Sequence, residues 1–198
     1  MQKLVIASNN QGKLREFQRM LAPLGIEVLT QAQLGIAEAD EPHVTFIENA
    51  LAKARHVSLL SGLPALADDS GICVTALDGA PGVLSARYAG ENPKSDQRNN
   101  EKLMRDMQGV TDRRAHYYCV LVLLHHANDP QPIIAEGEWL GEIALQPAGD
   151  GGFGYDPLFW LPDFGKTSAQ LEREQKHAIS HRGKALRVLL EKLKVMKG

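Results

Sequence analysis

The chain has no long hydrophobic run, no excess of basic residues and almost no cysteine. Its longest aliphatic stretch, Cys119–Leu124, is far too short to cross a bilayer. Lys and Arg number 22 against 24 Asp and Glu, and this balance disfavours a nucleic-acid polymer as partner. The two cysteines, Cys73 and Cys119, stand in apolar surroundings, which is typical of buried thiols in a reducing compartment.

The chain also lacks internal repeats, low-complexity tracts and linkers. Met1-Gln2-Lys3 leads directly into an apolar strand, without the layout of a signal peptide. With 198 residues and 43% apolar composition, we expect a single domain over residues 1–198 with no separable linker. We expect it to be cytoplasmic, with no membrane and no nucleic-acid partner.

Helical and strand patterns alternate in the first half of the chain, and a pair of long strands follows. This order favours an α/β fold around a mixed sheet. The expected strands cover residues 3–8, 26–30, 64–67, 72–77, 117–126 and 133–145, and the expected helices cover residues 13–21, 45–62, 96–107, 168–176 and 182–195.

Residues 8–13, Ser-Asn-Asn-Gln-Gly-Lys, lie between an apolar strand and a helix. We expect this turn to leave backbone N–H groups free, and Lys13 adds a positive charge at the helix start, as in phosphate sites. The turn is not a P-loop, because Ala7 replaces the first glycine and Leu14 the metal-binding hydroxyl. Taken alone, it could equally be an ordinary polar turn.

Asp68-Asp69-Ser70-Gly71 follows the apolar residues Leu66-Ala67. We expect it at the carboxyl end of a strand, in one cleft with residues 8–13. Adjacent carboxylates in a strand cannot face the same side, so one would face the cleft and the other support it. Carboxylates beside a phosphate site suggest Mg²⁺, with another ligand from the acidic loop 38–41. The alternative is a turn with an Asx hydrogen bond.

Two later segments carry further candidate residues. Residues 149–157 combine a glycine run with Phe153, which could stack on a base, and Asp156, which could accept hydrogen bonds from ring N–H groups. The alternative is a hairpin with Phe153 as a core residue. Residues 176–183 place cations at the start of the last helix, which suggests an anionic or carbonyl-rich ligand or, alternatively, a solvated basic turn.

Together these segments resemble the inosine triphosphate pyrophosphatase family, and especially its bacterial dITP/XTP pyrophosphatase branch. Each motif is weak alone, but all of them in this order are highly specific. The resemblance covers almost the whole chain and rests on Ser-Asn-Asn-Gln-Gly-Lys (8–13), Thr-Phe-Ile-Glu-Asn-Ala (45–50), Ala-Asp-Asp-Ser-Gly (67–71), Gly-Ala-Pro-Gly (79–82), Ser-Ala-Arg-Tyr (85–88), Gly-Gly-Phe-Gly-Tyr-Asp-Pro (151–157) and Ser-His-Arg (180–182).

The resemblance implies an elongated α/β domain with two lobes around a long mixed β-sheet flanked by helices, with the active-site cleft between the lobes. It also implies a homodimer that hydrolyses deaminated purine nucleoside triphosphates (ITP, dITP, XTP, dXTP) to the monophosphate and pyrophosphate with Mg²⁺. Glu41 and Asp69 would hold the metal, and Asp69 would orient or deprotonate the attacking water. Asp40 is the alternative ligand in the acidic loop.

The same resemblance assigns the substrate-binding residues. The triphosphate would be held by the turn and one further lysine, and the base and sugar by the two later segments. The implied substrate-binding residues are Ser8, Asn9, Asn10, Gln11, Gly12, Lys13, Lys53, Ser70, Phe153, Gly154, Tyr155, Asp156, Lys176, His181 and Arg182.

Two rival functions stay open at this point. The first is a pyrophosphatase for modified pyrimidine triphosphates, of the septum-inhibitor type, although such proteins carry a Ser-x-Ser-x-Arg turn. The second is a non-catalytic nucleotide sensor, against which the acidic pair argues.

Overall fold

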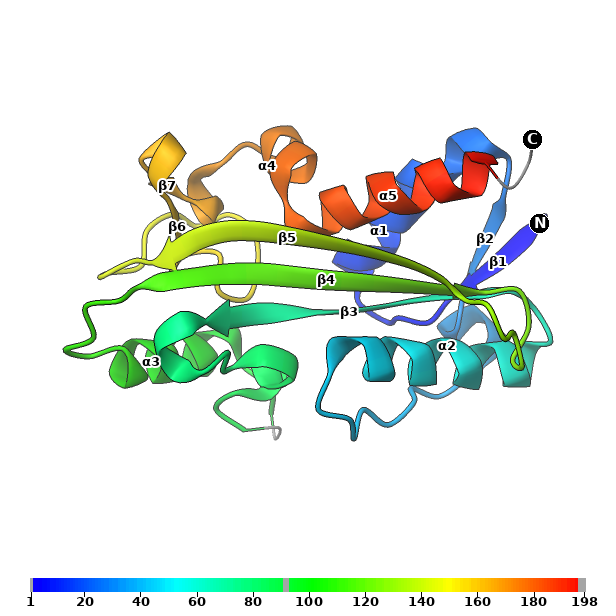
Figure 1. The fold of residues 1–198 in the computed structure, drawn as a ribbon, viewed down its shortest axis with the longest axis horizontal. Helices are drawn as coiled ribbons and strands as arrows, with labels where there is room; N and C mark the ends of the chain where they lie inside the picture. The colour runs from blue at the N-terminus through cyan, green and yellow to red at the C-terminus, as the bar shows by residue number, and fades with distance from the viewer. Residues whose placement is uncertain (1, 91–92, 196–198) are drawn as a thin grey trace. The chain divides into compact units, whose positions relative to one another are not determined.

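The computed structural model describes residues 2–90 and 93–195, apart from the side chains of Gln11 and Leu24. The strands are β1 (Lys3–Ile6), β2 (Glu27–Thr30), β3 (Ala65–Val74), β4 (Arg114–Leu124), β5 (Ile133–Ile143), β6 (Phe159–Leu161) and β7 (Lys166–Thr167) (Figure 1). The α-helices are α1 (Gln11–Leu21), α2 (Phe46–Ser61), α3 (Asp96–Asp106), α4 (Arg173–Ile179) and α5 (His181–Val195).

The seven strands form one sheet in the order β2-β1-β3-β4-β5-β6-β7. Strand β1 pairs in parallel with β2 and β3, whereas β6 pairs antiparallel with β5 and β7. The sheet is therefore mixed and carries helices, which confirms the predicted α/β class.

The chain divides into two compact units. Unit 1 consists of residues 1–69, 119–136 and 185–198, and unit 2 of residues 70–118 and 137–184. The boundaries fall inside β3, β4, β5 and α5, so each of these elements contributes residues to both units. The single domain without a separable linker stays a prediction.

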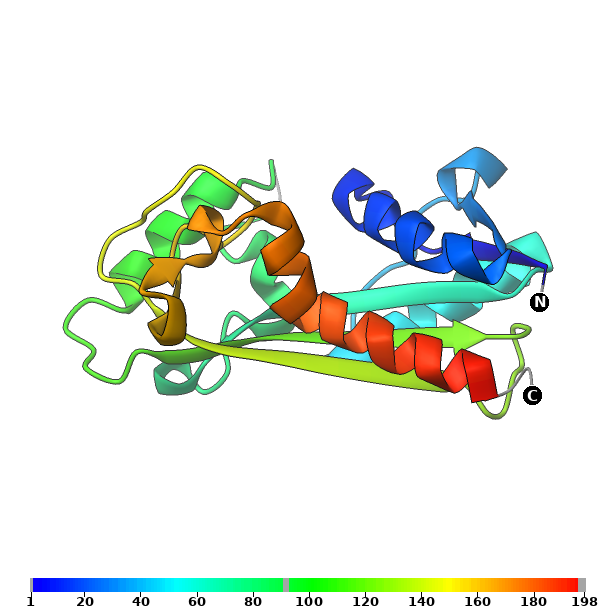
Figure 2. The ribbon, with the colours of Figure 1, turned by 90° about the horizontal axis from the view of Figure 1, so that it is seen from above.

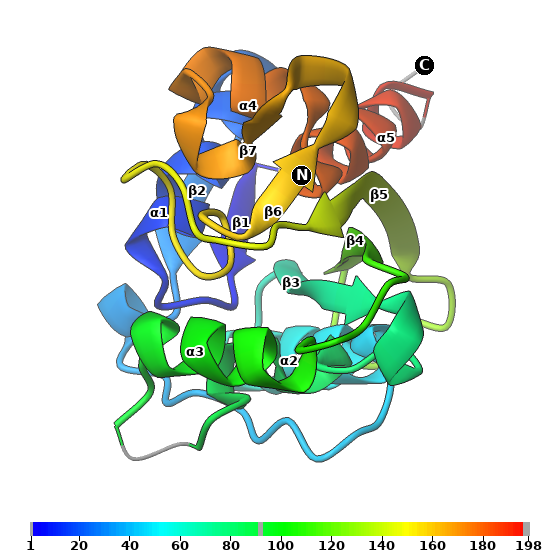
Figure 3. The same cartoon turned by 90° about the vertical axis from the view of Figure 1, so that its left-hand side faces the viewer.

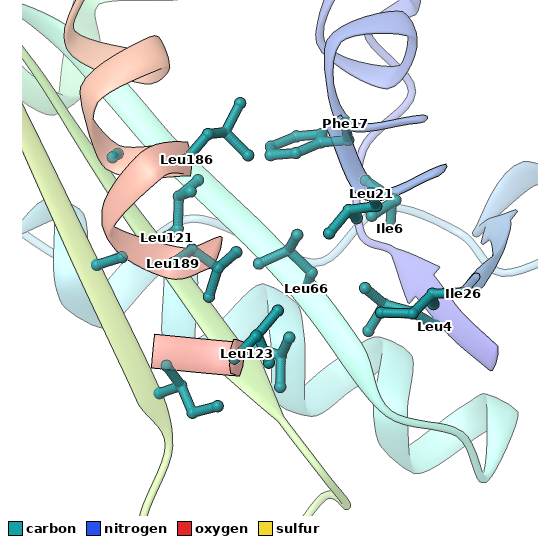
Figure 4. Packing of buried hydrophobic residues seen from close by; sticks show 14 of the residues in the cluster. Leu4, Ile6, Phe17, Leu21, Ile26, Leu66, Leu121, Leu123, Leu186 and Leu189 are labelled. Carbon is teal, nitrogen blue, oxygen red and sulfur yellow. The ribbon is translucent and has the colours of Figure 1, made fainter. Parts of the chain in front are cut away.

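In unit 1, α1 and the unit 1 part of α5 lie on the same face of the sheet, and α2 lies on the other face (Figures 1 and 2). Phe17 and Leu21 of α1 point toward the leucines of the sheet and of α5, among them Leu66 and Leu186 (Figure 4). Burial of these side chains fixes the start of α1 against β1 and β3, and this anchors the polar segment 8–13.

In unit 2, α3 and α4 lie on opposite faces of the sheet (Figure 3). The core is rich in aromatic side chains and includes Tyr117, Trp139, Tyr155 and Phe159. The Phe159 ring meets both Tyr117 and Trp139 edge-on, at centroid distances of 4.7 and 5.2 Å. This packing holds the glycine-rich segment that precedes β6.

The predicted end of a strand at Asp68–Gly71 is wrong. Strand β3 runs without interruption from Ala65 to Val74, and residues 75–77, predicted as strand, form a 3-10 helix. Asp, Ser and Gly favour turns locally, but here tertiary pairing overrides that preference. The aspartates are tolerated inside a buried strand because lysines from two helices pair with them.

Several predicted helix boundaries also differ from the structure, and the two largest differences are in α1 and α4. Helix α1 begins at Gln11 rather than at Lys13, because Asn10 caps it. The helix predicted over residues 168–176 is wrong in its first half. Residues 168–170 form a 3-10 helix with a capping box between Thr167 and Gln170, Leu171 is extended, and α4 begins only at Arg173.

Candidate active site

The segment before α1 is held by hydrogen bonds between backbone N–H groups and the side chains of Asn10 and Ser8. The Asn10 Oδ1 accepts hydrogen bonds from the backbone N–H groups of Gly12, at 2.9 Å, and Lys13, at 3.1 Å. The hydroxyl of Ser8 accepts from the N–H of Asn10. The expectation that the turn leaves its amides free is therefore wrong for residues 12 and 13, because Asn10 acts as an N-cap. Asn9 is exposed beside this cap.

Asp68 and Asp69 are neighbours in β3, so their side chains point to opposite faces of the sheet. The Lys13 Nζ of α1 lies 2.7 Å from Asp68 Oδ2. The Lys53 Nζ of α2 lies 3.2 Å from Asp69 Oδ1 and 2.5 Å from Glu41 Oε1. The two sets of contacts also influence each other electrostatically, since Asp68 affects the pKa of Lys53 and Lys13 that of Asp69. We call these five residues of unit 1, Lys13, Glu41, Lys53, Asp68 and Asp69, the lysine–carboxylate cluster.

In this cluster, burial and the opposite charges nearby shift the pKa values of Asp69 and Lys53 in opposite directions. Burial raises the pKa of Asp69, and Glu41 and Asp68 raise it further, against the opposing effect of Lys53 and Lys13. Burial alone would lower the pKa of Lys53, but the carboxylates of Asp69, Asp68 and Glu41 outweigh it, so the pKa is raised. With two lysines against three carboxylates, the cluster carries a surplus of negative charge.

A divalent cation fits this arrangement. Asp69 Oδ2 is buried and accepts no hydrogen bond from the described residues, so one oxygen of the predicted metal ligand is left for a cation. Within residues 2–90 and 93–195, no group of three or more His, Cys, Asp or Glu side chains is arranged to hold a metal ion. Two carboxylates suit Mg²⁺ nevertheless, since this ion completes its shell with water and substrate oxygens.

Unit 2 holds a second set of predicted site residues around Asp156, whose side chain is buried. Its Oδ2 accepts hydrogen bonds from the backbone N–H of Phe153, at 2.8 Å, and from Lys176 Nζ, and its Oδ1 accepts from Ser168. A Cβ at position 152 would collide with the same carboxylate, so glycine is required there. Asp156 therefore organises the loop, and its expected contact with the base stays a prediction.

Phe153 is 48% exposed, which excludes the alternative in which it fills the core. The Lys176 Nζ lies 5.1 Å from the centre of its ring, within the range of a cation–π contact. The neighbouring Tyr155 is buried, and its hydroxyl donates to the Ser85 carbonyl. Tyr155 thus contributes to the core, whereas Phe153 keeps about half of its surface exposed beside the Lys176 ammonium.

The start of α5 is buried, so the alternative of a solvated basic turn is wrong for His181 and Arg182, although Lys176 and His177 are partly exposed. His181 and Arg182 are 7% and 4% exposed. Arg182 Nη2 donates to Ser70 Oγ at 3.0 Å, and the His181 ring stacks on Tyr117 with centroids 4.7 Å apart. Sequence reasoning missed Tyr117, because a tyrosine inside an apolar strand gives no signal beyond core packing.

Sequence comparison places this chain among known proteins. A sequence model described as the Ham1 family matches residues 4–192. The chain belongs to the Ham1 family. It is 67% identical over 193 residues to the dITP/XTP pyrophosphatase of Nitrosomonas europaea, with 98% of this chain and 95% of that protein covered. It is 62% identical over 197 residues to the dITP/XTP pyrophosphatase of Ralstonia nicotianae, with 98% of each chain covered.

Solved Ham1 structures agree. The structure of a HAM1 protein from Coxiella burnetii matches with a TM-score of 0.94 at 45% identity, over 98% of this chain and 99% of that one. The Ham1 protein of Staphylococcus aureus matches with a TM-score of 0.90 at 41% identity, over 98% of this chain and 100% of that one. These matches confirm the resemblance drawn from the motifs. No helix in the described ranges is long and apolar enough to span a membrane.

Proposed function

We propose that this Ham1 protein hydrolyses deaminated purine nucleoside triphosphates, dITP and XTP among them, to the nucleoside monophosphate and pyrophosphate. The near-full-length identity to two dITP/XTP pyrophosphatases carries this proposal. The lysine–carboxylate cluster supports it, because phosphoryl chemistry needs positioned charge more than a covalent nucleophile.

In this proposal water attacks the α-phosphorus and the bond to the α–β bridging oxygen breaks, so pyrophosphate leaves intact. Asp69 orients the water and takes its proton. Lys13 and Lys53 offset the charge of the phosphate chain, with the segment 8–12 alongside.

Mg²⁺ is the cofactor that the cluster fits, with Glu41 and Asp69 as its ligands. When bound, it would neutralise charge on the phosphate oxygens and lower the pKa of a bound water. Glu41 is favoured over Asp40 in the acidic loop because its Oε1 shares the Lys53 ammonium with Asp69.

We assign the binding of the base to residues of unit 2. Phe153 stacks on the purine, since its ring is exposed and its backbone is held. Arg182, with His181 and Lys176, donates to the C6 carbonyl that distinguishes inosine and xanthosine from adenosine. A buried donor left facing an amino group costs about 1–3 kcal/mol, which corresponds to roughly tenfold to a hundredfold selectivity.

We further infer a homodimer and a cytoplasmic location, where the nucleotide pool is found. The dimer follows from the family resemblance, and the location from two cysteines that stand in apolar surroundings. Size-exclusion chromatography with light scattering on the purified protein tests the dimer directly.

The deciding experiment is product analysis with ITP, dITP, XTP, ATP, GTP and modified pyrimidine triphosphates, with and without Mg²⁺, in ¹⁸O-labelled water. We expect labelled IMP and unlabelled pyrophosphate from ITP. IDP and single phosphate would refute the assigned bond. Preference for a pyrimidine would favour the first rival function, and binding without turnover would favour the sensor.

A further inference from the structure

Two side chains of α3 form hydrogen bonds with the backbone of Gly154, the residue after Phe153. Asp96 Oδ2 accepts a hydrogen bond from the Gly154 N–H at 2.7 Å, and Asn100 Nδ2 donates to the Gly154 carbonyl at 2.9 Å. Asp96 and Asn100 are four residues apart, so they lie on one face of the helix. Both polar backbone groups of a single glycine, held at a φ of 62°, are thus bound by one helix.

The helix that grips Gly154 is itself fixed. Asn99 is 2% exposed, and its amide donates to the carbonyls of Ser85 and Ala86 and accepts from the N–H of Ala89. The Ser85 carbonyl also accepts from the hydroxyl of Tyr155. The 3-10 segment 82–87 therefore ties α3 and the glycine-rich segment to one buried anchor.

Phe153 lies between this grip and the Asp156 carboxylate. Its own N–H donates to Asp156 Oδ2, and the next residue is held by Asp96 and Asn100. The backbone is thus bound on both sides of an aromatic ring that remains half-exposed. A ring held in place before the ligand arrives loses less conformational entropy on binding.

We propose that Asp96 and Asn100 are positioning residues that hold Phe153 ready to stack on the base. We call this pair the α3 clamp. The proposal rests on the stacking role assigned to Phe153 under the proposed function, and it adds two residues that do not themselves contact the substrate.

The first test compares steady-state kinetics of Asp96→Ala and Asn100→Ala with ITP. We expect KM to rise about threefold to tenfold, a part of the full stacking contribution, with kcat nearly unchanged. Asp96→Asn keeps an acceptor oxygen but removes the charge, so it should retain the wild-type KM. The matched controls are Gln97→Ala and Glu101→Ala, an exposed pair of the same helix that bond to each other at 3.0 Å. These controls should change neither constant.

The second test repeats Asp96→Ala in a Phe153→Ala background. If the clamp acts through Phe153, the KM of the double variant should equal that of Phe153→Ala alone. The same KM increase in both backgrounds would overturn the proposal, as would an Asp96→Ala KM equal to that of wild type. Asp96→Asn behaving like Asp96→Ala would point to helix charge instead and would also overturn it.

A third readout needs no substrate. Limited proteolysis by a non-specific protease, mapped by mass spectrometry, should cut residues 149–154 faster in Asp96→Ala and Asn100→Ala than in the controls. Equal cutting would show that α3 does not hold the loop. If cutting is faster but Phe153→Ala leaves KM unchanged, the clamp stands and the stacking role fails.

Discussion

Lys13 and Asp68 form an ion pair that ties the first turn of α1 to the middle of β3. The Nζ and Oδ2 atoms lie 2.7 Å apart, and the side chains are 17% and 1% exposed. The pair sets where the Lys13 charge lies before any phosphate binds. Asp68 therefore acts beside Asp69 without sharing its face of the strand.

The contribution of this ion pair should be measurable in the free energy of unfolding. Lys13→Met and Asp68→Asn should each lower the free energy of unfolding by about 2–4 kcal/mol, because each removes the 2.7 Å ion pair and leaves a largely buried charge less well compensated. The double variant removes both charges, so its loss in free energy of unfolding should be clearly smaller than the sum of the losses of the two single variants. Urea denaturation of the four proteins measures the coupling. Strict additivity would show that the two charges do not stabilise one another.

Asp69→Asn tests the general base and metal ligand. The variant should stay folded but lose turnover by at least about 10²-fold, because the amide neither accepts the proton nor carries charge for the cation. Asp112→Asn, which removes an exposed carboxylate paired with Arg114, is the control and should keep wild-type turnover. Near wild-type turnover of Asp69→Asn at saturating Mg²⁺ would remove Asp69 from the mechanism.

Phe153→Ala and Arg182→Ala should have different kinetic signatures. Phe153→Ala should lower kcat/KM for ITP, XTP and ATP by the same factor, because stacking does not depend on ring substituents. The factor should correspond to a loss of about 1–3 kcal/mol of stacking free energy. Arg182→Ala should instead narrow the preference for ITP over ATP, since it removes a donor matched to the C6 carbonyl. Thermal melts check folding, since Arg182 also holds Ser70. An equal loss for ITP and ATP would identify Arg182 as a phosphate or structural cation.

The motifs predicted the fold class and the elements with strong local signals. Helix α2 follows from Thr45, whose hydroxyl accepts from the Glu48 N–H, and from Gly62 at its end. The prediction that β3 is interrupted was wrong because the local signal there was misleading. Asp68–Gly71 has the composition of a turn, and the lysines that stabilise it as strand come from residues 13 and 53, which no local pattern connects to it.

The same limit applies to the site. The family resemblance assigned Lys53 to the same site as Lys13 and Asp69, and the structure places all three residues in unit 1. It could not be read from the sequence that Asn10 caps the amides expected to be free, because cap and ligand use the same N–H groups. The grip of α3 on Gly154 joins residues 58 apart in the chain and gives no periodic signal.

Cys73 should react slowly with alkylating reagents in the folded protein. Burial, with a smaller effect of Glu138, raises the pKa of its thiol to about 11. The reactive thiolate is thus a small fraction at pH 7.5, and it should grow about tenfold per pH unit until the pH reaches that value. Iodoacetamide labelling followed by mass spectrometry measures the rate, with the urea-unfolded protein as the fast control. Rapid labelling of folded Cys73, a partly buried residue, at pH 7.5 would contradict the raised pKa of its thiol.

Asp129 should stabilise the turn between β4 and β5 in a pH-dependent way. Its carboxylate accepts from the backbone N–H groups of His125 and Gln131, both at 2.9 Å, and these bonds lower its pKa to about 2. A lowered pKa in the folded state means that the stabilisation is complete above the unfolded pKa, near 4, and is lost as the pH falls toward 2. Asp129→Ala should therefore cost about 1–2 kcal/mol at pH 7 and roughly half of that at pH 3. Denaturant titrations of both proteins at the two pH values measure the difference, and a cost that is the same at pH 3 and pH 7 would show that the carboxylate charge does not hold this turn.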